Sequence, residues 1–318
     1  MPHSYLKHAV LPLLVVLATL GIALWLPDSA EHPAAQHPYF VFTALGVLAA
    51  MLAFSIAGMS FPPLGEAFAR KAPFYAGVLS LFCLYNILTA KTALLPVLYF
   101  PSPDNIFGVF FEDMPFLLKC LAYSLRLLVL GWIGGIIAGF LTGVAVGFNR
   151  HVRYWVLPWV RILGPIPATA WIPIVLVCFP SVVSASAFLI GLAVWFPTTV
   201  LTASGIANIE KAYFEAAATL GASKSYTIRK VGIPAAMPHM FLGLFNGTCA
   251  SFLTLVTAEM LGAKYGIGWY INWQKEMMAY PNVYAGLMVM SLTCFALLTL
   301  LFRVRNKVLV WQKGVIQW

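Results

Sequence analysis

Charged residues are scarce in this chain. They make up only 9% of its 318 residues, whereas an ordinary soluble domain carries roughly 25%. Hydrophobic residues make up 61%. A water-soluble domain of this size cannot bury so much apolar surface, and a disordered chain would be poor in apolar residues and rich in charge. The composition excludes both classes and predicts a polytopic membrane protein.

Residue patterns that hold metals are also missing. The five cysteines are widely spaced without a C-x-x-C pair, and the six histidines show no H-E-x-x-H spacing. We therefore expect no metal site and no redox motif. Clusters of His, Asp or Glu at one interface are absent as well, which argues against a membrane-embedded enzyme. No catalytic residues are predicted.

Long apolar runs dominate what remains. Because they are continuous rather than alternating, they favour transmembrane helices over a β-barrel. At roughly 20 residues per span, the sequence predicts an all-α fold with about eight transmembrane helices. The predicted spans cover residues 9–26, 39–60, 74–98, 121–148, 155–179, 184–204, 239–258 and 283–302.

Basic residues indicate the orientation, because Lys and Arg are retained on the cytoplasmic side. Eight spans with both termini inside place most of them on one face. These are Lys7, Arg70, Lys71, Arg150, Arg153, Lys211, Lys224, Arg229, Lys230, Arg303, Arg305, Lys307 and Lys313. The net charge of +9 thus indicates topology and weak attraction to anionic lipid, not nucleic-acid binding.

Two spans contain unusual residues. A glycine stripe with a spacing of four runs along the span at 121–148, and it favours close helix packing, with a sliding surface as the alternative. Its members are Gly131, Gly135, Gly139, Gly143 and Gly147. In the span at 155–179, Pro165 and Pro167 must distort the backbone. Broken helices are tolerated in membranes where they line a cavity or are buried in protein.

The segment between the sixth and seventh spans is the most informative. Ala and Leu around Glu215 favour a helix, Gly221 breaks it, and Ser223 is placed to cap a second helix. We predict two short helices joined at Gly221 on the cytoplasmic face, suited to docking in a groove of another protein.

This segment resembles the EAA loop of the permease subunits of binding-protein-dependent ABC importers. It retains Glu215, Ala216, Ala217, Gly221 and Pro234 at the family spacing, with Val231 and Ile233 as conservative departures. The resemblance implies coupling helices that dock on an ATPase subunit. Gly221-Ala222-Ser223-Lys224-Ser225 lacks the G-x-x-x-x-G-K-[ST] pattern and no strand precedes it, so we expect no nucleotide site in this chain.

Further motifs resemble the permeases for nitrate, sulfonate, taurine and bicarbonate, across about residues 95–315. They include Gly164-Pro165-Ile166-Pro167, Ala170-Trp171-Ile172-Pro173 and the run from Ala258 to Gly268. The implied organisation has extra N-terminal transmembrane helices at 1–94 and an extracytoplasmic segment at 95–120. A type I ABC importer permease core follows at 121–303, with its EAA loop at 208–236, and a cytoplasmic tail at 304–318.

The resemblance implies an importer permease in a bacterial inner membrane, working with a second permease copy, ABC ATPase subunits and an extracytoplasmic substrate-binding protein. No cofactor is expected on this chain, and ATP and Mg are expected on the ATPase. The substrate class implied is a small anion or organic acid. The alternatives are another small solute such as a vitamin precursor, or a stand-alone secondary transporter, although mid-span charges and an inverted repeat are absent.

Candidate residues for the transport pathway are Pro165, Pro167, Trp171, Thr254, Thr257, Glu259 and Arg126. Polar residues within a span usually face the bundle interior, although hydroxyls also bond to neighbouring helices. For Glu259 we favour a structural or gating role, with a Lys264 pair as an alternative. Arg126 is expected to snorkel to the interface, with attraction of an anion as its alternative.

Overall fold

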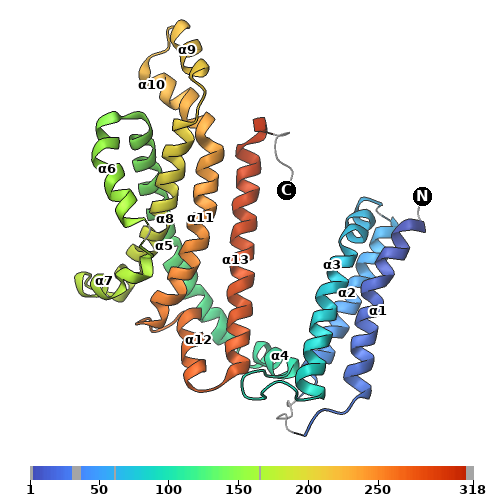
Figure 1. Cartoon of the computed structure of the whole chain (residues 1–318). Helices are drawn as coiled ribbons and strands as arrows, with labels where there is room; N and C mark the ends of the chain where they lie inside the picture. The colour runs from blue at the N-terminus through green and yellow to red at the C-terminus, as the bar shows by residue number, and fades with distance from the viewer. Residues whose placement is uncertain (1–2, 31–36, 61, 165, 313–318) are drawn as a thin grey trace. The chain divides into compact units, whose positions relative to one another are not determined.

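The computed structural model describes residues 3–30, 37–60, 62–164 and 166–312, and every regular element within these ranges is helical (Figure 1). The all-α prediction is confirmed. The chain forms two compact units. Unit 1 comprises Met1–Pro115 and Trp273–Ala285, and unit 2 comprises Phe116–Asn272 and Gly286–Trp318.

Unit 1 is built around three long apolar helices. They are α1 (His3–Trp25), α2 (Tyr39–Ser60) and α3 (Pro62–Asn86), which a π-helical turn, η1 (Ile87–Lys91), extends. Each of the three helices contacts the other two, and the short helix α4 (Pro103–Glu112) contacts α2. Their apolar residues occur all around the helix, which is typical of helices surrounded by lipid and protein.

Polar side chains close the helix ends of unit 1. Lys91 is only 4% exposed, and its Nζ donates to the carbonyls of Ala23 and Leu26 at 2.9 and 2.6 Å, near the C-terminus of α1. It also pairs with Asp28 at 2.8 Å. Asp104 Oδ1 accepts a hydrogen bond of 2.9 Å from the Phe40 amide at the start of α2. These contacts satisfy backbone groups that a helix end leaves unpaired.

Unit 2 contains most of α5 (Met114–Phe148), followed by α6 (Arg150–Leu163), η2 (Ala168–Trp171), α7 (Ile172–Cys178) and α8 (Val182–Ala207). Two short helices, α9 (Lys211–Thr219) and α10 (Lys224–Thr227), and the π-turn η3 (Ile228–Gly232) lead into α11 (Ile233–Met260). The last elements are α12 (Ile267–Glu276), α13 (Tyr280–Val308) and η4 (Val310–Gln312). The chain enters unit 1 briefly within α12 and α13.

The core of unit 2 lies where α5, α8, α11 and α13 meet. Leu128, Ile190 and Leu255 are buried there, and Met290 and Leu297 of α13 pack against them. Helices α8 and α11 run closely along each other, because glycines on α11 face the backbone of α8. A Cβ on Gly243 or Gly247 would lie 3.1–3.2 Å from α8 backbone atoms.

The eight predicted spans all have helical counterparts. Among the described residues, six helices are long and apolar enough to cross a membrane, or seven spans if α6 and the η2–α7 pair form one, and Val10–Trp25 is a shorter apolar helix. The distortion predicted within the span at 155–179 is confirmed, because α6 and the η2–α7 pair are bent by 88° at a break. The bounds of the span predicted at 74–98 are shifted along the chain, since α3 begins at Pro62 and η1 ends at Lys91. Ala93 has φ 47°, outside the right-handed helical region, which prevents the helix from continuing.

Candidate functional site

The segment from α9 to α10 extends beyond the long helices of unit 2 (Figure 1). α9 ends at Thr219, Gly221 adopts φ +75°, and the Ser223 hydroxyl accepts a 3.3 Å hydrogen bond from the Tyr226 amide at the start of α10. The predicted pair of short helices is therefore confirmed. No atom lies within 4 Å of a Cβ on Gly221, so the backbone conformation, not lack of space, favours glycine there.

The predicted ATPase-coupling residues lie on this segment with different exposure. Glu215, Ala216 and Gly221 are exposed, Ala217 is buried, and Pro234 lies in the first turn of α11. Two apolar side chains of the segment also face outward, because Tyr213 is 58% and Leu220 86% exposed. An exposed surface of this kind on a short helix fits docking into a groove of a partner.

A phenylalanine connects this segment to α5. The ring of Phe148, the last residue of α5, lies 6.4 Å from the ring of Phe214 on α9. A Cβ on Gly232 would lie 2.3 Å from Phe148, so the start of α11 also meets that ring. Sequence reasoning missed Phe148, because its contacts lie far along the chain. The Phe148 ring at the end of α5 therefore meets both α9 and the turn that leads into α11.

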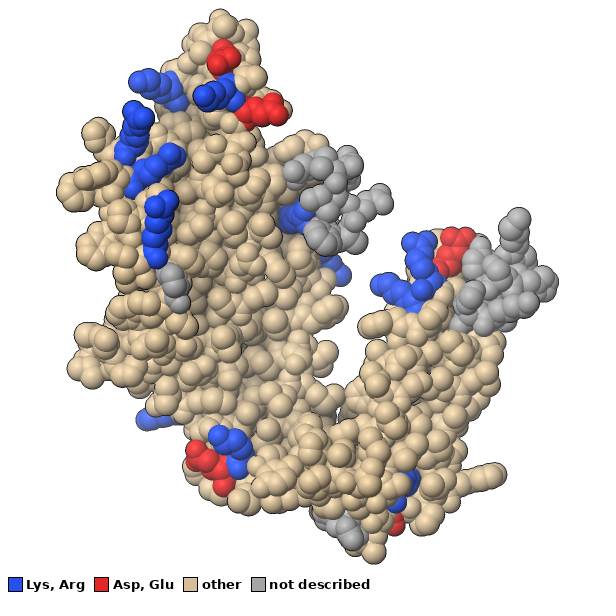
Figure 2. All heavy atoms as spheres, viewed as in Figure 1, with Lys and Arg blue, Asp and Glu red and all other residues tan. Residues whose placement is uncertain are grey.

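The end of unit 2 that carries this segment is also its basic end. Figure 2 shows Lys and Arg gathered over α6, α9 and α10, with few charges over the middle of the unit. The exposed basic residues there are Arg150, Arg153, Lys211, Lys224, Arg229 and Lys230.

All five glycines of the predicted stripe face α8. A Cβ added to any of them would lie 2.5–2.7 Å from an α8 atom. The partners are Ala187 or Ile190 for Gly131, Gly191 for Gly135, Thr198 for Gly139, Thr202 for Gly143 and Ile206 for Gly147. Hydrogen bonds fasten the same contact: Thr199 Oγ1 donates to the Gly139 carbonyl at 3.3 Å and lies 2.7 Å from Thr142 Oγ1. The two helices thus touch backbone to backbone along most of α8.

The break between α6 and η2 borders a cavity of about 280 Å³. Two of the predicted pathway residues, Pro167 and Thr254, lie on its wall, and Pro165 lies outside the described residues. Asn246 and Trp195 also line it and were missed, although an asparagine in the middle of an apolar span is a signal that the sequence contains. None of the described lining residues is charged.

The other predicted pathway residues do not line this cavity. Trp171 packs against the buried cluster of Ile172, Val175 and Leu189. Thr257 Oγ1 donates to the Leu253 carbonyl of its own helix at 2.9 Å. Arg126 is exposed, and within the described part of the chain it has no ion pair.

Glu259 is a buried junction between three helices. It is 1% exposed, and its carboxylate accepts hydrogen bonds of 2.7 Å from Ser124 Oγ on α5 and from the Gly268 amide in α12. The Ser124 hydroxyl in turn accepts one of 2.8 Å from the Ile267 amide. The described residues contain no Glu259–Lys264 ion pair, so the α12 N-terminus, not Lys264, partners the acid. Carboxylates are favoured at such a terminus.

Comparisons with known proteins agree with this geometry. The family model "Binding-protein-dependent transport system inner membrane component" matches residues 135–310. The taurine transport system permease protein TauC of Escherichia coli (strain K12) is 26% identical over 255 residues, 78% of this chain and 92% of that protein. The nitrate import permease protein NrtB of Leptolyngbya laminosa is 33% identical over 151 residues, 48% of this chain and 54% of that protein.

The fold has a solved counterpart. A chain of the MetNI methionine ABC transporter, in an inward-facing conformation, aligns with a TM-score of 0.53 at 18% identity, covering 62% of this chain and 98% of that one. At this identity the likeness concerns the fold alone. Because the family model matches more than half of the chain, this multi-pass membrane protein belongs to the binding-protein-dependent transport system inner membrane components, the permease subunits of ABC importers.

Proposed function

We propose that this chain forms the transmembrane pathway of an ATP-driven importer for a small anion or organic acid. The substrate class is supported by the relatives named for taurine and nitrate. The observation that carries the mechanism is the exposed α9–α10 segment with Glu215 and Gly221. ATP and Mg bind to separate ATPase subunits, and a second copy of the chain completes the pathway.

The proposed orientation places both termini and the α9–α10 segment in the cytoplasm. The basic end of unit 2 in Figure 2 supports it, because Lys and Arg are retained on that side. A substrate-binding protein delivers the substrate on the opposite face. This places the ATPases against Tyr213 and Leu220, where the exposed apolar surface of the segment lies.

The proposed mechanism is alternating access. ATP shifts the population towards one conformation only by binding it more tightly than the other. The closing ATPases move α9, and Phe214 passes that motion to Phe148 at the end of α5, while Gly232 at the end of η3 lies against the same ring. Since α5 packs tightly on α8, the two helices move together, and α8 forms part of the wall of the substrate cavity.

The cavity beside the broken helix is the proposed substrate route. Its polar groups are neutral: Thr169 and Asn246 can donate hydrogen bonds without a fixed positive charge, while the Thr254 hydroxyl donates to the Ala250 carbonyl of its own helix. Neutral donors hold an anion weakly, which suits a step that must release the substrate again. The substrate-binding protein then delivers the substrate from outside and provides most of the selectivity.

Copurification tests the coupling proposal. The tagged chain, expressed with the ATPase encoded beside it, is expected to retain that ATPase. Glu215→Gln and Gly221→Ala are expected to lower both retention and ATP-dependent uptake. Glu66→Gln removes an exposed acid from unit 1 and serves as the matched control. Full retention and full uptake in both coupling variants would contradict the proposal.

Uptake into proteoliposomes tests the route. Asn246→Leu removes an amide from the cavity wall, whereas Asn306→Leu removes an exposed amide from α13 as its control. We expect the first variant to reduce uptake of sulfonate or nitrate while ATPase retention stays unchanged. Equal uptake by both variants would place the route elsewhere.

A further inference from the structure

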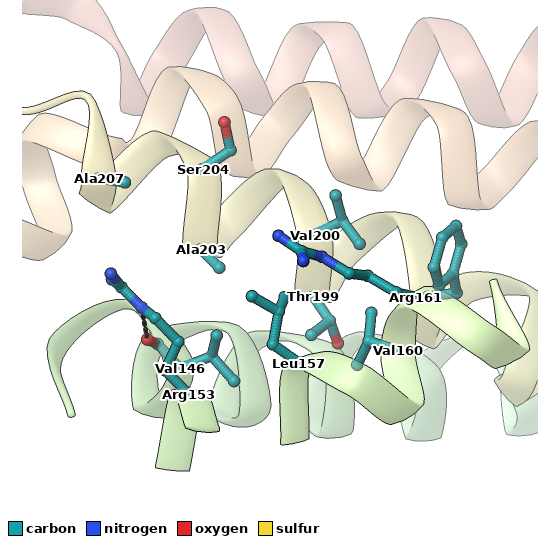
Figure 3. Close-up of a pocket in the computed structure, with 11 residues that line it drawn as sticks. Val146, Arg153, Leu157, Val160, Arg161, Thr199, Val200, Ala203, Ser204 and Ala207 are labelled. Atoms are coloured by element: carbon teal, nitrogen blue, oxygen red, sulfur yellow. Dashed lines mark hydrogen bonds between the residues drawn. The ribbon is translucent and has the colours of Figure 1, made fainter. Parts of the chain in front are cut away.

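A second cavity lies in unit 2 among α5, α6 and α8. It has a volume of about 490 Å³. Most of its wall is apolar, and the wall includes Val146, Leu157, Val160, Phe196, Val200 and Ala203. The two charged side chains among the eleven described lining residues are both arginines, Arg153 and Arg161, as Figure 3 shows.

One face of α6 supplies both arginines. Arg153, Leu157, Val160 and Arg161 follow a helical spacing of four, three and one, so they share the side of α6 that borders the cavity. At 1.5 Å per residue, the two arginine Cα atoms lie about 12 Å apart along the helix axis. The cavity therefore lies along a stretch of α6 with a cation towards each end.

The remaining surface of α6 is aromatic and exposed. Trp155 and Trp159, 70% and 63% exposed, lie opposite the cavity side, and Tyr154, 72% exposed, lies next to Arg161 around the helix. Tyr and Trp are enriched at the boundary between bilayer and water, where an amphipathic helix lies with its apolar side in the lipid. The cavity thus lies beneath a helix suited to the membrane interface, where phospholipid headgroups are at high local concentration.

Both guanidinium groups have donors available. Arg153 donates to the carbonyls of Val146 and Gly147 at 3.1 and 2.8 Å, which occupies two of its five N–H groups. Arg161 extends from α6 towards α8 along the cavity (Figure 3). In the described part of the chain it forms no ion pair or hydrogen bond, and none of the described lining residues is acidic. The site therefore has unneutralised positive charge beside apolar walls.

We propose that this cavity binds an anionic phospholipid, with the phosphate between Arg153 and Arg161 and the first carbons of the acyl chains against Leu157, Val160 and Val200. Guanidinium groups pair with phosphate through two parallel hydrogen bonds. Basic pockets between transmembrane helices bind anionic headgroups in this way. A free inorganic anion carries the same negative charge as the lipid phosphate, but it has no apolar part to contact the apolar walls.

Titration of the full-length chain in neutral detergent tests the site, with native mass spectrometry as the measurement. The probes are phosphatidylglycerol, phosphatidylcholine and inorganic phosphate. We expect preferential retention of phosphatidylglycerol. The double variant Arg153→Gln/Arg161→Gln is expected to bind it about 30-fold more weakly, because each arginine near a lipid surface contributes about 1 kcal/mol.

Three further variants separate the contributions of charge, location and cavity space. Arg303→Gln removes an exposed arginine on α13 and should retain the lipid. Arg153→Lys/Arg161→Lys should restore much of the binding lost in the Gln pair, even though Arg153 also bonds to the end of α5. Ala203→Phe fills the cavity while leaving both charges, and should lose the lipid.

Four results would overturn the proposal. They are equal retention of phosphatidylcholine, equal loss in Arg303→Gln, unchanged binding in Ala203→Phe, and displacement of the lipid by inorganic phosphate at equal concentration. The last result would identify a free-anion site. None of these readouts depends on ATPase binding or uptake, so the test stands apart from the proposed transport function.

Discussion

Glycines distinguish the two units of the molecule. In unit 1, a Cβ on Gly21, Gly46 or Gly77 would meet no atom within 4 Å, whereas Gly58 and Gly65, near the α2–α3 turn, approach each other closely and Gly108 lies against the Tyr39 ring. In unit 2, each glycine of the α5 stripe has an α8 atom within 2.7 Å of its missing Cβ. The three glycines within the unit 1 helices thus have room for a side chain, whereas the five of the α5 stripe do not.

Polar groups show a parallel difference. Unit 1 uses them at helix ends, where Lys91 and Asp104 bond to backbone groups. Unit 2 also uses them between helices, as in the Thr142–Thr199 contact and the Glu259–Ser124 bond. The family match at 135–310 lies almost entirely in unit 2. Specific hydrogen bonds between helices therefore stabilise unit 2, whereas unit 1 is stabilised mainly by apolar packing and by hydrogen bonds at its helix ends.

The largest effect is expected at the stripe. Gly135→Ala places a methyl 2.5 Å from the Gly191 carbonyl of α8, and Gly139→Ala places one 2.7 Å from the Thr198 Cβ. Overpacking of this kind costs about 1–3 kcal/mol. Both should lower the melting temperature in detergent and reduce uptake. Gly46→Ala, in the open space of α2, is the control and should leave both unchanged. Equal melting of all three variants would remove the contrast between the units.

The next effect is expected at Glu259. Glu259→Ala leaves the buried Gly268 amide and the Ser124 hydroxyl without their acceptor, and each unpaired buried group costs about 1–3 kcal/mol. Glu259→Gln keeps one acceptor oxygen and should lose less. Thermal unfolding of the two variants measures the difference. A Gln variant as unstable as the Ala variant would mean that the charge, and not the geometry, matters.

A smaller loss of stability is expected at Lys91. Lys91→Met removes donors from the Ala23 and Leu26 carbonyls, while the pair with the 64% exposed Asp28 adds little. The melting temperature should fall, whereas uptake per folded molecule should stay at the wild-type level because the site lies in unit 2. Asp28→Asn is the matched control and should melt nearly as the wild type. A Lys91→Met protein that is stable but transports poorly would show that unit 1 takes part in transport.

For Gly221→Ala we expect the opposite pattern to Lys91→Met: transport should fall more than stability. A left-handed conformation costs an L-residue about 1–2 kcal/mol, and that strain falls on an exposed turn. Global melting should change little, while ATPase retention and uptake should fall clearly. Gly221→Asn tolerates the conformation better and should recover part of the uptake. Equal uptake by the Ala and Asn variants would exclude the turn conformation as the cause.

The smallest effect is a pH dependence in unit 1. Burial raises the pKa of the Asp104 carboxyl, although the hydrogen bond from Phe40 opposes the shift. Because the folded state then binds the proton more tightly than the unfolded state, stability should rise as the pH falls through the folded pKa. Asp104→Asn should flatten that part of the melting profile. An unchanged profile would assign the dependence to another group.

Local features of the sequence were predictable, and contacts between distant residues were not. The α9–Gly221–α10 turn follows from helix formers, a glycine and a capping serine that are all neighbours. The proline-rich region predicted distortion, but not an 88° bend, because the bend depends on what packs around it. Glu259 was recognised as special, yet Ser124 lies 135 residues away and no local pattern pairs them. Arg153 indicated only orientation from the sequence, because its place beside the cavity depends on how α8 packs against α6.

The glycine stripe has a mechanical consequence. α5 measures about 52 Å at 1.5 Å per residue, and it is attached to α8 at five successive levels. Two helices in contact at so many levels resist sliding past each other and behave as one rigid unit. Phe148, which contacts α9, lies at one end of α5, and Ser124, which bonds to Glu259, lies towards the other, so this helix joins the α9 segment to the Glu259 junction.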